Sequence, residues 1–337
     1  QQILAYETDL LEYEDLFDGS HVVTAKTEAL KDEARAMLAK LDASGGTIDN
    51  IDFMKTALVE SQRARLKEIE AGRQIVVGVN RYETTEASPL SGGDGSIMAQ
   101  DHGAESRQIA KLKAWRSKRS DDAVANAIGE LRAAAASGAN IMPPSIAAAK
   151  AGVTVGEWGA ALREAFGEYR GPTGVAVIIQ TDGEEDLEKV KGEVERVSKK
   201  LGRTLTYVVG KPGLDGHSNG SEQIAARARQ AGMNVIYEGI RFTPEEIVQQ
   251  AIDSKAHVVG LSILSGSHLD LVKDTLGVLR AKGLNIPVVV GGIIPEADAL
   301  ALKQMGVRRV YTPKDYKITQ IMGDVVKVVE ETLTTAE

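Results

Sequence analysis

Three side chains that can do acid–base and metal chemistry lie close together in one glycine-rich stretch. The stretch is Lys211-Pro-Gly-Leu-Asp-Gly-His-Ser-Asn-Gly220, and it carries Lys211, Asp215 and His217. Asp215 and His217 are two positions apart, which is close enough for a carboxylate to orient an imidazole. A histidine held through one ring nitrogen is suited to bind a metal through the other. The spacing therefore suits a metal ligand, but on these residues alone a histidine that is merely exposed on a loop stays the favoured alternative.

The segments on either side of this stretch are expected to fix its place at the edge of a sheet. The apolar run Leu205–Val209 precedes it, and a helical pattern over Ser221–Gln230 follows it. A strand, a glycine-rich loop and a helix place functional groups at the carboxyl end of a parallel strand. Because charged and titratable side chains stand among the glycines, the loop differs from a phosphate cradle.

The same alternation of strand and helix continues to the end of the chain. Five such pairs with short connections predict a parallel sheet covered on both faces, a flavodoxin-like doubly wound α/β domain. The expected strand order is 2-1-3-4-5, with a crevice between strands 1 and 3 at their carboxyl ends. The predicted strands are Leu205–Val209, Asn234–Tyr237, Val258–Ile263, Pro287–Val290 and Arg309–Tyr311. The predicted helices are Ser221–Ala231, Pro244–Ser254, Leu269–Lys282, Glu296–Met305 and Ile318–Leu333.

The residues before this domain show mostly helical periodicity. Gln74–Asn80 is the exception, because its β-rich composition predicts a buried strand. Glycine and proline predict loops over Glu86–Gly103 and Gly171–Gly183. These changes of pattern divide the chain into residues 1–85, 86–203 and 204–337. The predicted helices are Thr27–Leu41, Phe53–Ala71, Glu105–Arg119, Ala123–Ser137, Ser145–Lys150, Thr154–Phe166 and Leu187–Leu201.

Composition excludes several classes of function. A formal net charge of −8 argues against a nucleic-acid backbone or an anionic membrane as the main partner. The chain has no cysteine, which excludes disulfides, thiolate metal sites and a cysteine nucleophile. No apolar run approaches the roughly 20 residues of a membrane span. We therefore expect a cytoplasmic protein, and because the chain begins at Gln1, we expect a fragment of a longer one.

Three segments are expected to meet at the crevice. They are the Asp215/His217 loop, the Ser262-Ile-Leu264 segment after strand 3, and Gly291-Gly292 after strand 4. Glycines without side-chain bulk let the backbone approach a large ligand closely. The crevice offers hydroxyls and backbone amides, so it suits a large, mostly neutral ligand with a metal at one end. The glycines in these segments are Gly213, Gly216, Gly220, Gly266, Gly291 and Gly292.

The combination resembles a known family. Asp215-Gly-His217-Ser-Asn-Gly220, followed by Ser262-Ile-Leu264 and Gly291-Gly292, is similar to the D-x-H-x-x-G, S-x-L and G-G pattern of cobalamin-binding domains. Three upstream segments resemble the post-barrel and linker regions of adenosylcobalamin-dependent acyl-CoA mutases, the methylmalonyl-CoA mutase family. They are Ile75-Val-Val-Gly-Val-Asn80, Gln108-Ile-Ala-Lys-Leu112 and Phe166-Gly-Glu-Tyr-Arg170. On this resemblance, residues 1–85 are the end of a (β/α)8 barrel, 86–203 a helical linker and 204–337 the cobalamin-binding domain.

The resemblance implies a role for each residue of the crevice. The cofactor would bind with its dimethylbenzimidazole tail detached from cobalt, and His217 would become the lower axial ligand. Asp215 would hold the far nitrogen of His217, and Lys211 would pair with Asp215. In the tail site, Ser262 would hydrogen-bond the tail base and Leu264 would pack on it. Backbone at Gly291 and Gly292 would lie against the base, and Thr312 is a further candidate contact.

The implied reaction is a radical isomerisation of an acyl-CoA. Gly210-Lys-Pro-Gly-Leu-Asp-Gly-His-Ser-Asn-Gly220 and Tyr311-Thr-Pro-Lys-Asp-Tyr316 are most similar to the family branch that interconverts ethylmalonyl-CoA and methylsuccinyl-CoA. The catalytic residues are expected in a barrel upstream and none is assigned here. The family also implies a homodimer and a G-protein chaperone that loads the cofactor.

Three alternatives stay open on these residues. One is methylmalonyl-CoA mutase activity, and a second is a non-catalytic corrinoid carrier with the same histidine motif. A third, a phosphorylated receiver domain, is disfavoured because such a domain needs an aspartate at the end of strand 3, where this chain has Ser262. The other histidines have no ligand spacing and are expected to be structural or exposed; they are His21, His102, His257 and His268.

Overall fold

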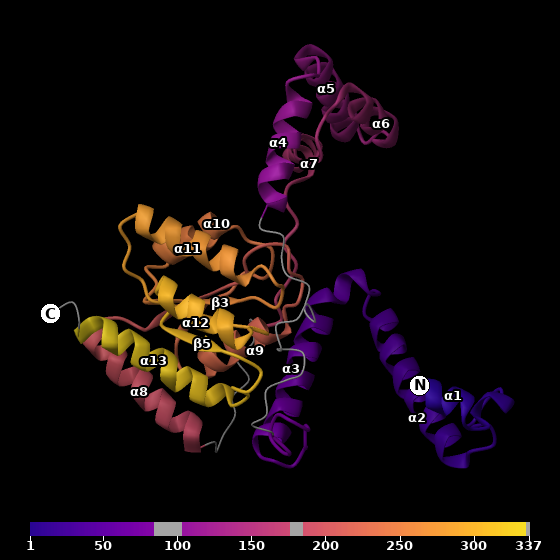
Figure 1. Cartoon of the computed structure of the whole chain (residues 1–337), viewed down its shortest axis with the longest axis vertical. Helices are drawn as coiled ribbons and strands as arrows, with labels where there is room; N and C mark the ends of the chain where they lie inside the picture. Colours follow the sequence, from indigo (N-terminus) through magenta and orange to yellow (C-terminus); the bar gives the residue numbers. More distant parts are fainter. Residues whose placement is uncertain (84–102, 176–184, 335–337) are drawn as a thin grey trace.

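The carboxyl-terminal part of the chain is an α/β domain built on a parallel sheet (Figure 1). The computed structural model describes residues 1–83, 103–175 and 185–334. The sheet has five strands in the order β2-β1-β3-β4-β5, which confirms the predicted order and places the crevice where β1 and β3 are neighbours. The strands are β1 (Thr206–Gly210), β2 (Asn234–Ile236), β3 (Val258–Ser262), β4 (Val288–Gly291) and β5 (Arg309–Tyr311).

Alternate residues of each strand face two separate aliphatic cores. Tyr207 and Val209 of β1 belong to the core under α8, α9 and α13, whereas Val208 belongs to the core under α10, α11 and α12. This two-sided burial explains why the strands read as almost continuous apolar runs in the sequence. The covering helices are α8 (Glu185–Leu201), α9 (Asn219–Gln230), α10 (Pro244–Asp253), α11 (His268–Ala281), α12 (Glu296–Met305) and α13 (Ile318–Thr334).

Helix ends follow their capping residues. Thr243 accepts a hydrogen bond from the backbone of Glu246, whose side chain accepts one in return, so α10 begins with a complete capping box. Thr154 and Glu157 form a second complete capping box at the start of the helix that follows Thr154. Gly138 ends α5 (Asp121–Ser137) in the left-handed conformation with a φ of 73°, which glycine adopts at helix ends.

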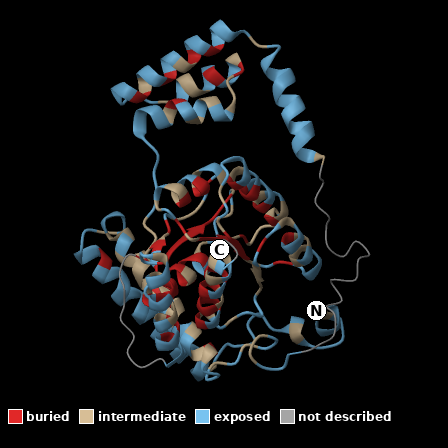
Figure 2. Cartoon of the chain, turned by 90° about the vertical axis from the view of Figure 1, so that its left-hand side faces the viewer, coloured by how far each residue is buried: buried red, intermediate tan, exposed pale blue. Residues whose placement is uncertain are grey.

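The amino-terminal part is helical and much less buried than the α/β domain (Figure 2). α3 packs along α9, where Lys55 pairs with Glu222 at 2.6 Å and the Val59 carbonyl accepts a hydrogen bond from Gln223 at 2.9 Å. The helical elements are α1 (Gln2–Tyr6), η1 (Leu10–Glu12), α2 (His21–Ala43), η2 (Ile48–Asn50) and α3 (Ile51–Glu70).

The strand predicted over Gln74–Asn80 is wrong. The segment is a turn with an isolated bridge between Val77 and Arg81, and Val77 is 73% exposed. Asn80 holds the turn, because its side chain accepts from the Val76 amide and donates to the Ile69 and Gln74 carbonyls. A β-rich run needs a partner strand, and none of the described residues offers one here.

A small helical unit stands apart from the sheet in Figure 1. Arg119 ties its helices together through two hydrogen bonds to Glu157, of 2.7 and 2.6 Å, and one to the Gly152 carbonyl. The predicted loop over Glu86–Gly103 and most of that over Gly171–Gly183 lie outside the described residues. The helices are α4 (Ala104–Arg116), α5 (Asp121–Ser137), α6 (Met142–Ala151) and α7 (Val155–Phe166).

Candidate functional site

The loop after β1 joins Lys211, Asp215 and His217 in one hydrogen-bonded chain. Lys211 Nζ donates to Asp215 Oδ2 at 2.9 Å and to the Ser262 carbonyl at 3.3 Å. Asp215 Oδ1 lies 2.7 Å from His217 Nδ1 and accepts the His217 amide at 3.0 Å. The Leu264 amide donates to Asp215 Oδ2 at 2.9 Å. The carboxylate therefore fixes the histidine loop to the end of β3. The sequence predicts the contacts of Asp215 with Lys211 and His217, but not the contact with the Leu264 amide.

Asp215 is anionic although it is almost completely buried. Its side chain is 3% exposed, and that of Lys211 is 0% exposed. Burial alone would raise the pKa of Asp215, but hydrogen bonds from the His217 amide, Lys211, the His217 ring and the Leu264 amide outweigh it and hold the pKa well below the usual range. A buried lysine is tolerated because the carboxylate neutralises it.

His217 presents a free ring nitrogen to solvent. Its side chain is 74% exposed, in contrast to its two partners. Because an ionised carboxylate can only accept, Nδ1 carries a proton, and Nε2 is the ring nitrogen that stays open to a ligand. Within the described ranges, no group of three or more His, Asp or Glu side chains is arranged to hold a metal ion. Any metal held at this loop would therefore have to rely on fewer than three such side chains among the described residues.

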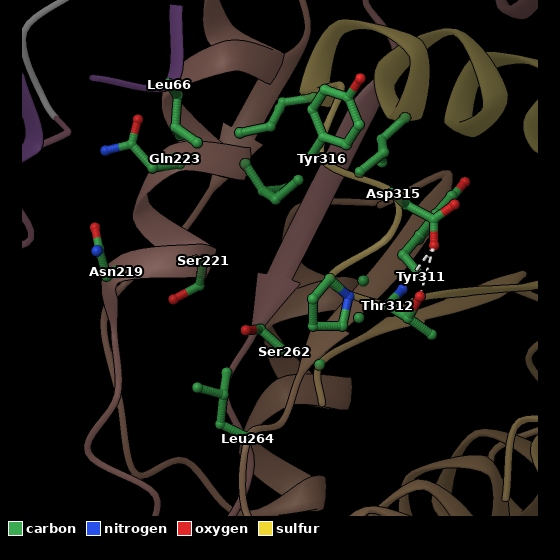
Figure 3. A pocket seen from close by; sticks show the side chains of 18 of the residues that line it. Leu66, Asn219, Ser221, Gln223, Ser262, Leu264, Tyr311, Thr312, Asp315 and Tyr316 are labelled. Carbon is green, nitrogen blue, oxygen red and sulfur yellow. Dashed lines mark hydrogen bonds between the residues drawn. The ribbon is translucent and has the colours of Figure 1, made fainter. Parts of the chain in front are cut away.

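A cavity of about 460 Å³ opens beside this loop, between the sheet and helices α9 and α13. Figure 3 shows Ser221 and Gln223 on one side, Tyr311 and Thr312 on the other, and Ser262 and Leu264 between them. The volume falls in the ordinary range of small-molecule sites, roughly 300–1,000 Å³. The predicted residues that line it are Gly220, Ser262, Leu264, Gly291, Gly292 and Thr312.

The remaining predicted residues lie outside the cavity wall. They belong to the histidine loop and to the loop after β3. Hydrogen bonds from Lys211 to the Ser262 carbonyl and from the Leu264 amide to Asp215 connect the histidine loop to the cavity wall. The predicted set therefore forms two adjoining parts, a histidine loop and a cavity. The residues outside the wall are Lys211, Gly213, Asp215, Gly216, His217 and Gly266.

Two of the glycines are required by the backbone itself. A Cβ at Gly292 would stand 1.9 Å from the Ile263 carbonyl oxygen, so β4 can approach the loop after β3 only with glycine there. Gly213 has a φ of +78°, and a Cβ there would stand 2.9 Å from Leu271. At Gly216, Gly220 and Gly266 a Cβ would meet nothing within 4 Å, so these positions leave open space.

Thr312 is held by its own loop. Its amide and its hydroxyl both donate to Asp315 Oδ2, at 2.7 and 3.2 Å, and Figure 3 shows these bonds at the cavity wall. The hydroxyl proton is therefore already used, which leaves the methyl group and the lone pairs of the hydroxyl oxygen available to a ligand.

Sequence reasoning missed several cavity residues. Tyr207, Gly260 and Tyr311 lie inside strands, where their alternation toward one face was a usable signal. Leu66 and Ile69 come from α3, and nothing in the sequence indicated that α3 covers this cavity. Tyr311 Oη is completely buried and has no hydrogen-bond partner in the described structure.

Two family models match the chain. The model described as B12 binding domain matches residues 205–317, which hold the whole histidine loop and all five strands. The model described as Methylmalonyl-CoA mutase matches residues 1–168. The chain belongs to the methylmalonyl-CoA mutase family. The expected correspondence of the amino-terminal part with the mutase region is confirmed, whereas the bounds 1–85, 86–203 and 204–337 stay a prediction.

Relatives within this family differ in how similar they are to the chain. The ethylmalonyl-CoA mutase of Cereibacter sphaeroides is 58% identical over 337 residues, which is 100% of this chain and 52% of the relative. The ethylmalonyl-CoA mutase of Methylorubrum extorquens is 54% identical over 99% of this chain and 48% of the relative. The methylmalonyl-CoA mutase of Cereibacter sphaeroides is 32% identical over 93% of this chain and 44% of the relative.

The chain thus spans about half the length of these relatives. Over the part of the chain that the structure describes, none of the helices combines the length and the apolar character needed to cross a membrane.

Proposed function

We propose that this chain supplies the cobalamin-binding part of an adenosylcobalamin-dependent isomerase that interconverts ethylmalonyl-CoA and methylsuccinyl-CoA. The observation that carries the proposal is His217, whose Nδ1 is held by a buried, ionised Asp215 while Nε2 stays exposed beside a glycine-walled cavity. The higher identity to the two ethylmalonyl-CoA mutases, 58% and 54% against 32%, supports the choice of substrate.

The residues present fit a cobalamin bound with its base detached from cobalt. The exposed Nε2 of His217 would hold the cobalt, and Asp215 and Lys211 would fix the orientation of its ring. The neighbouring cavity is mostly apolar, with hydroxyls at Ser262 and Ser221, so it suits a flat aromatic base with few polar atoms. The histidine loop would thus hold the cobalt, and the cavity would hold the tail base.

The chain's own residues would bind and orient the cofactor rather than carry out the rearrangement. When bound, adenosylcobalamin supplies a carbon radical by homolysis of its cobalt–carbon bond. Asp215 would keep a proton on Nδ1, so that Nε2 would be the nitrogen of His217 that holds the metal. No acid or base for the acyl-CoA is assigned to this chain. The adenosyl form, the cytoplasmic location, a homodimer and a G-protein chaperone belong to the same proposal.

A non-catalytic corrinoid carrier is the second candidate. The same histidine motif would serve it equally well. The match of residues 1–168 to the mutase model favours the isomerase, because a carrier has no use for a substrate domain.

The test is a comparison of substrates on the full-length protein. With adenosylcobalamin added, we expect ethylmalonyl-CoA to be isomerised with a higher kcat/KM than methylmalonyl-CoA, measured by chromatography of the CoA esters. The reverse preference would reassign the substrate. Base-off cobalamin binding without turnover of either ester would support the carrier.

A further inference from the structure

A second histidine–carboxylate pair lies between α11 and α12, outside the cavity wall. His268 Nε2 lies 2.8 Å from Asp298 Oδ2, and His268 Nδ1 lies 3.3 Å from the Ser265 carbonyl oxygen. The two helices pack against each other, and His268 and Asp298 stand in their first turns. The pair therefore connects the start of α12 to the loop after β3.

The exposure of this pair is the reverse of that at His217. The His268 side chain is 5% exposed and that of Asp298 is 32% exposed, whereas the His217 side chain is 74% exposed and that of Asp215 is 3% exposed. A carboxylate and a carbonyl can only accept, so each His268 nitrogen that makes its bond carries a proton. Both ring nitrogens thus face protein acceptors, and neither is open to a metal. His268 is therefore suited to hold protein backbone rather than a ligand.

The backbone that His268 holds belongs to the loop that also holds the metal-binding histidine. Ser265 directly follows Leu264, whose amide donates to Asp215 Oδ2 at 2.9 Å. The other oxygen of Asp215 lies 2.7 Å from His217 Nδ1. Asp215 and His268 therefore hold adjacent residues of one loop. A shift of the loop at Ser265 would move the Leu264 amide, and with it the carboxylate that orients His217.

We propose that His268 and Asp298 are positioning residues for His217. They hold the loop after β3 where the Leu264 amide keeps Asp215 on the histidine ring. The inference rests on the proposed function and deepens it. Residues that orient a metal ligand act on metal affinity without touching the metal. Loss of the pair should therefore weaken cobalamin binding only while His217 is there to bind cobalt.

The test is a double-mutant cycle on the full-length protein, with the dissociation constant of adenosylcobalamin measured by absorbance titration. The four proteins are the unmodified protein, His268→Ala, His217→Ala and the double variant. We expect His268→Ala alone to raise the dissociation constant about tenfold, the lower end of what the loss of an orienting partner costs a metal site. In the His217→Ala background the same substitution should change it less than about twofold, because no histidine is left to position.

The dependence on His217 separates positioning from stability. A merely structural role of His268 would give equal losses with and without His217, because the effects of independent sites add. Asp298→Ala breaks the same pair from its more exposed side and should show the same dependence on His217. This second variant decides the test where His268→Ala does not fold.

His257→Ala is the matched control. His257 lies in the same domain and also bonds backbone, because its Nδ1 accepts the Thr206 amide at 2.8 Å. Thr206 is at the amino-terminal end of β1, away from the histidine loop. The control should leave the dissociation constant of the folded protein unchanged.

Two results would overturn the inference alone. One is an unchanged dissociation constant in both His268→Ala and Asp298→Ala, and the other is equal losses with and without His217. The His217→Ala variant tests the proposed function by itself. If it binds adenosylcobalamin with the affinity and the spectrum of the unmodified protein, the proposed function and the inference both fail.

Discussion

Apolar residues recur at helical spacing in two helices of this chain that have very different surroundings. α13 has 17 residues and buries eight of them against β-sheet and α8, whereas α2 has 23 residues and buries only Leu41. In α2, Val23, Leu30 and Met37 recur every seven residues and all stay exposed. The comparison teaches that periodicity predicts a helix in both regions, but only a facing surface turns it into a stable core.

The largest expected difference between the two regions concerns a lysine. Lys211→Met leaves Asp215 buried without its cation and should destabilise the α/β domain by about 3–5 kcal/mol. Lys31→Met on α2 breaks only an exposed pair with Glu28 and should cost less than about 0.5 kcal/mol. Urea unfolding followed by circular dichroism measures both. Equal losses would contradict the contrast.

A leucine truncation should separate the regions somewhat less. Leu205 is 0% exposed directly before β1, and Leu205→Ala should destabilise the domain by about 2–5 kcal/mol. Leu30 is 66% exposed, so the matched Leu30→Ala should stay within about 0.5 kcal/mol. The same unfolding experiment decides. A large loss from Leu30→Ala would mean that α2 packs against a surface in solution.

The smallest difference should appear with pH. Burial, and secondarily Arg203, lowers the pKa of His257 to about 4, and its Nδ1 accepts the Thr206 amide at 2.8 Å. Between about pH 6.5, the ordinary pKa of histidine, and pH 4, the unfolded chain takes up a proton that the folded domain does not. The free energy of unfolding should therefore fall as the pH falls through this window. Above the window, His257 should contribute nothing to its pH dependence.

His257→Gln should flatten that part of the pH profile, measured as the urea midpoint at several pH values. His21→Gln, on the exposed start of α2, is the control and should leave the profile unchanged. An identical slope in His257→Gln and the unmodified chain would refute the role of His257.

Sequence reasoning predicted the α/β domain well because its rules are local. Strand and helix alternate with short connections from Thr204 onward, and that alternation leaves few arrangements of the sheet. The contacts of Asp215 with Lys211 and His217 were predictable because these residues are only four and two positions away from it in the chain. The failures concerned distant segments. The sequence did not predict that α3 covers the cavity or that the Leu264 amide donates to Asp215. Nor did it predict that Gln74–Asn80 lacks a partner strand and forms a turn.

The central claim is that His217 binds cobalt through Nε2, and it has one direct test. The measurement is electron paramagnetic resonance of cob(II)alamin bound to protein labelled with nitrogen-15 in histidine only. We predict that the superhyperfine triplet seen with unlabelled protein becomes a doublet, and that His217→Ala loses the protein nitrogen altogether. A triplet that persists in the labelled protein would show that the nitrogen on cobalt comes from the cofactor's own base, and would contradict the account.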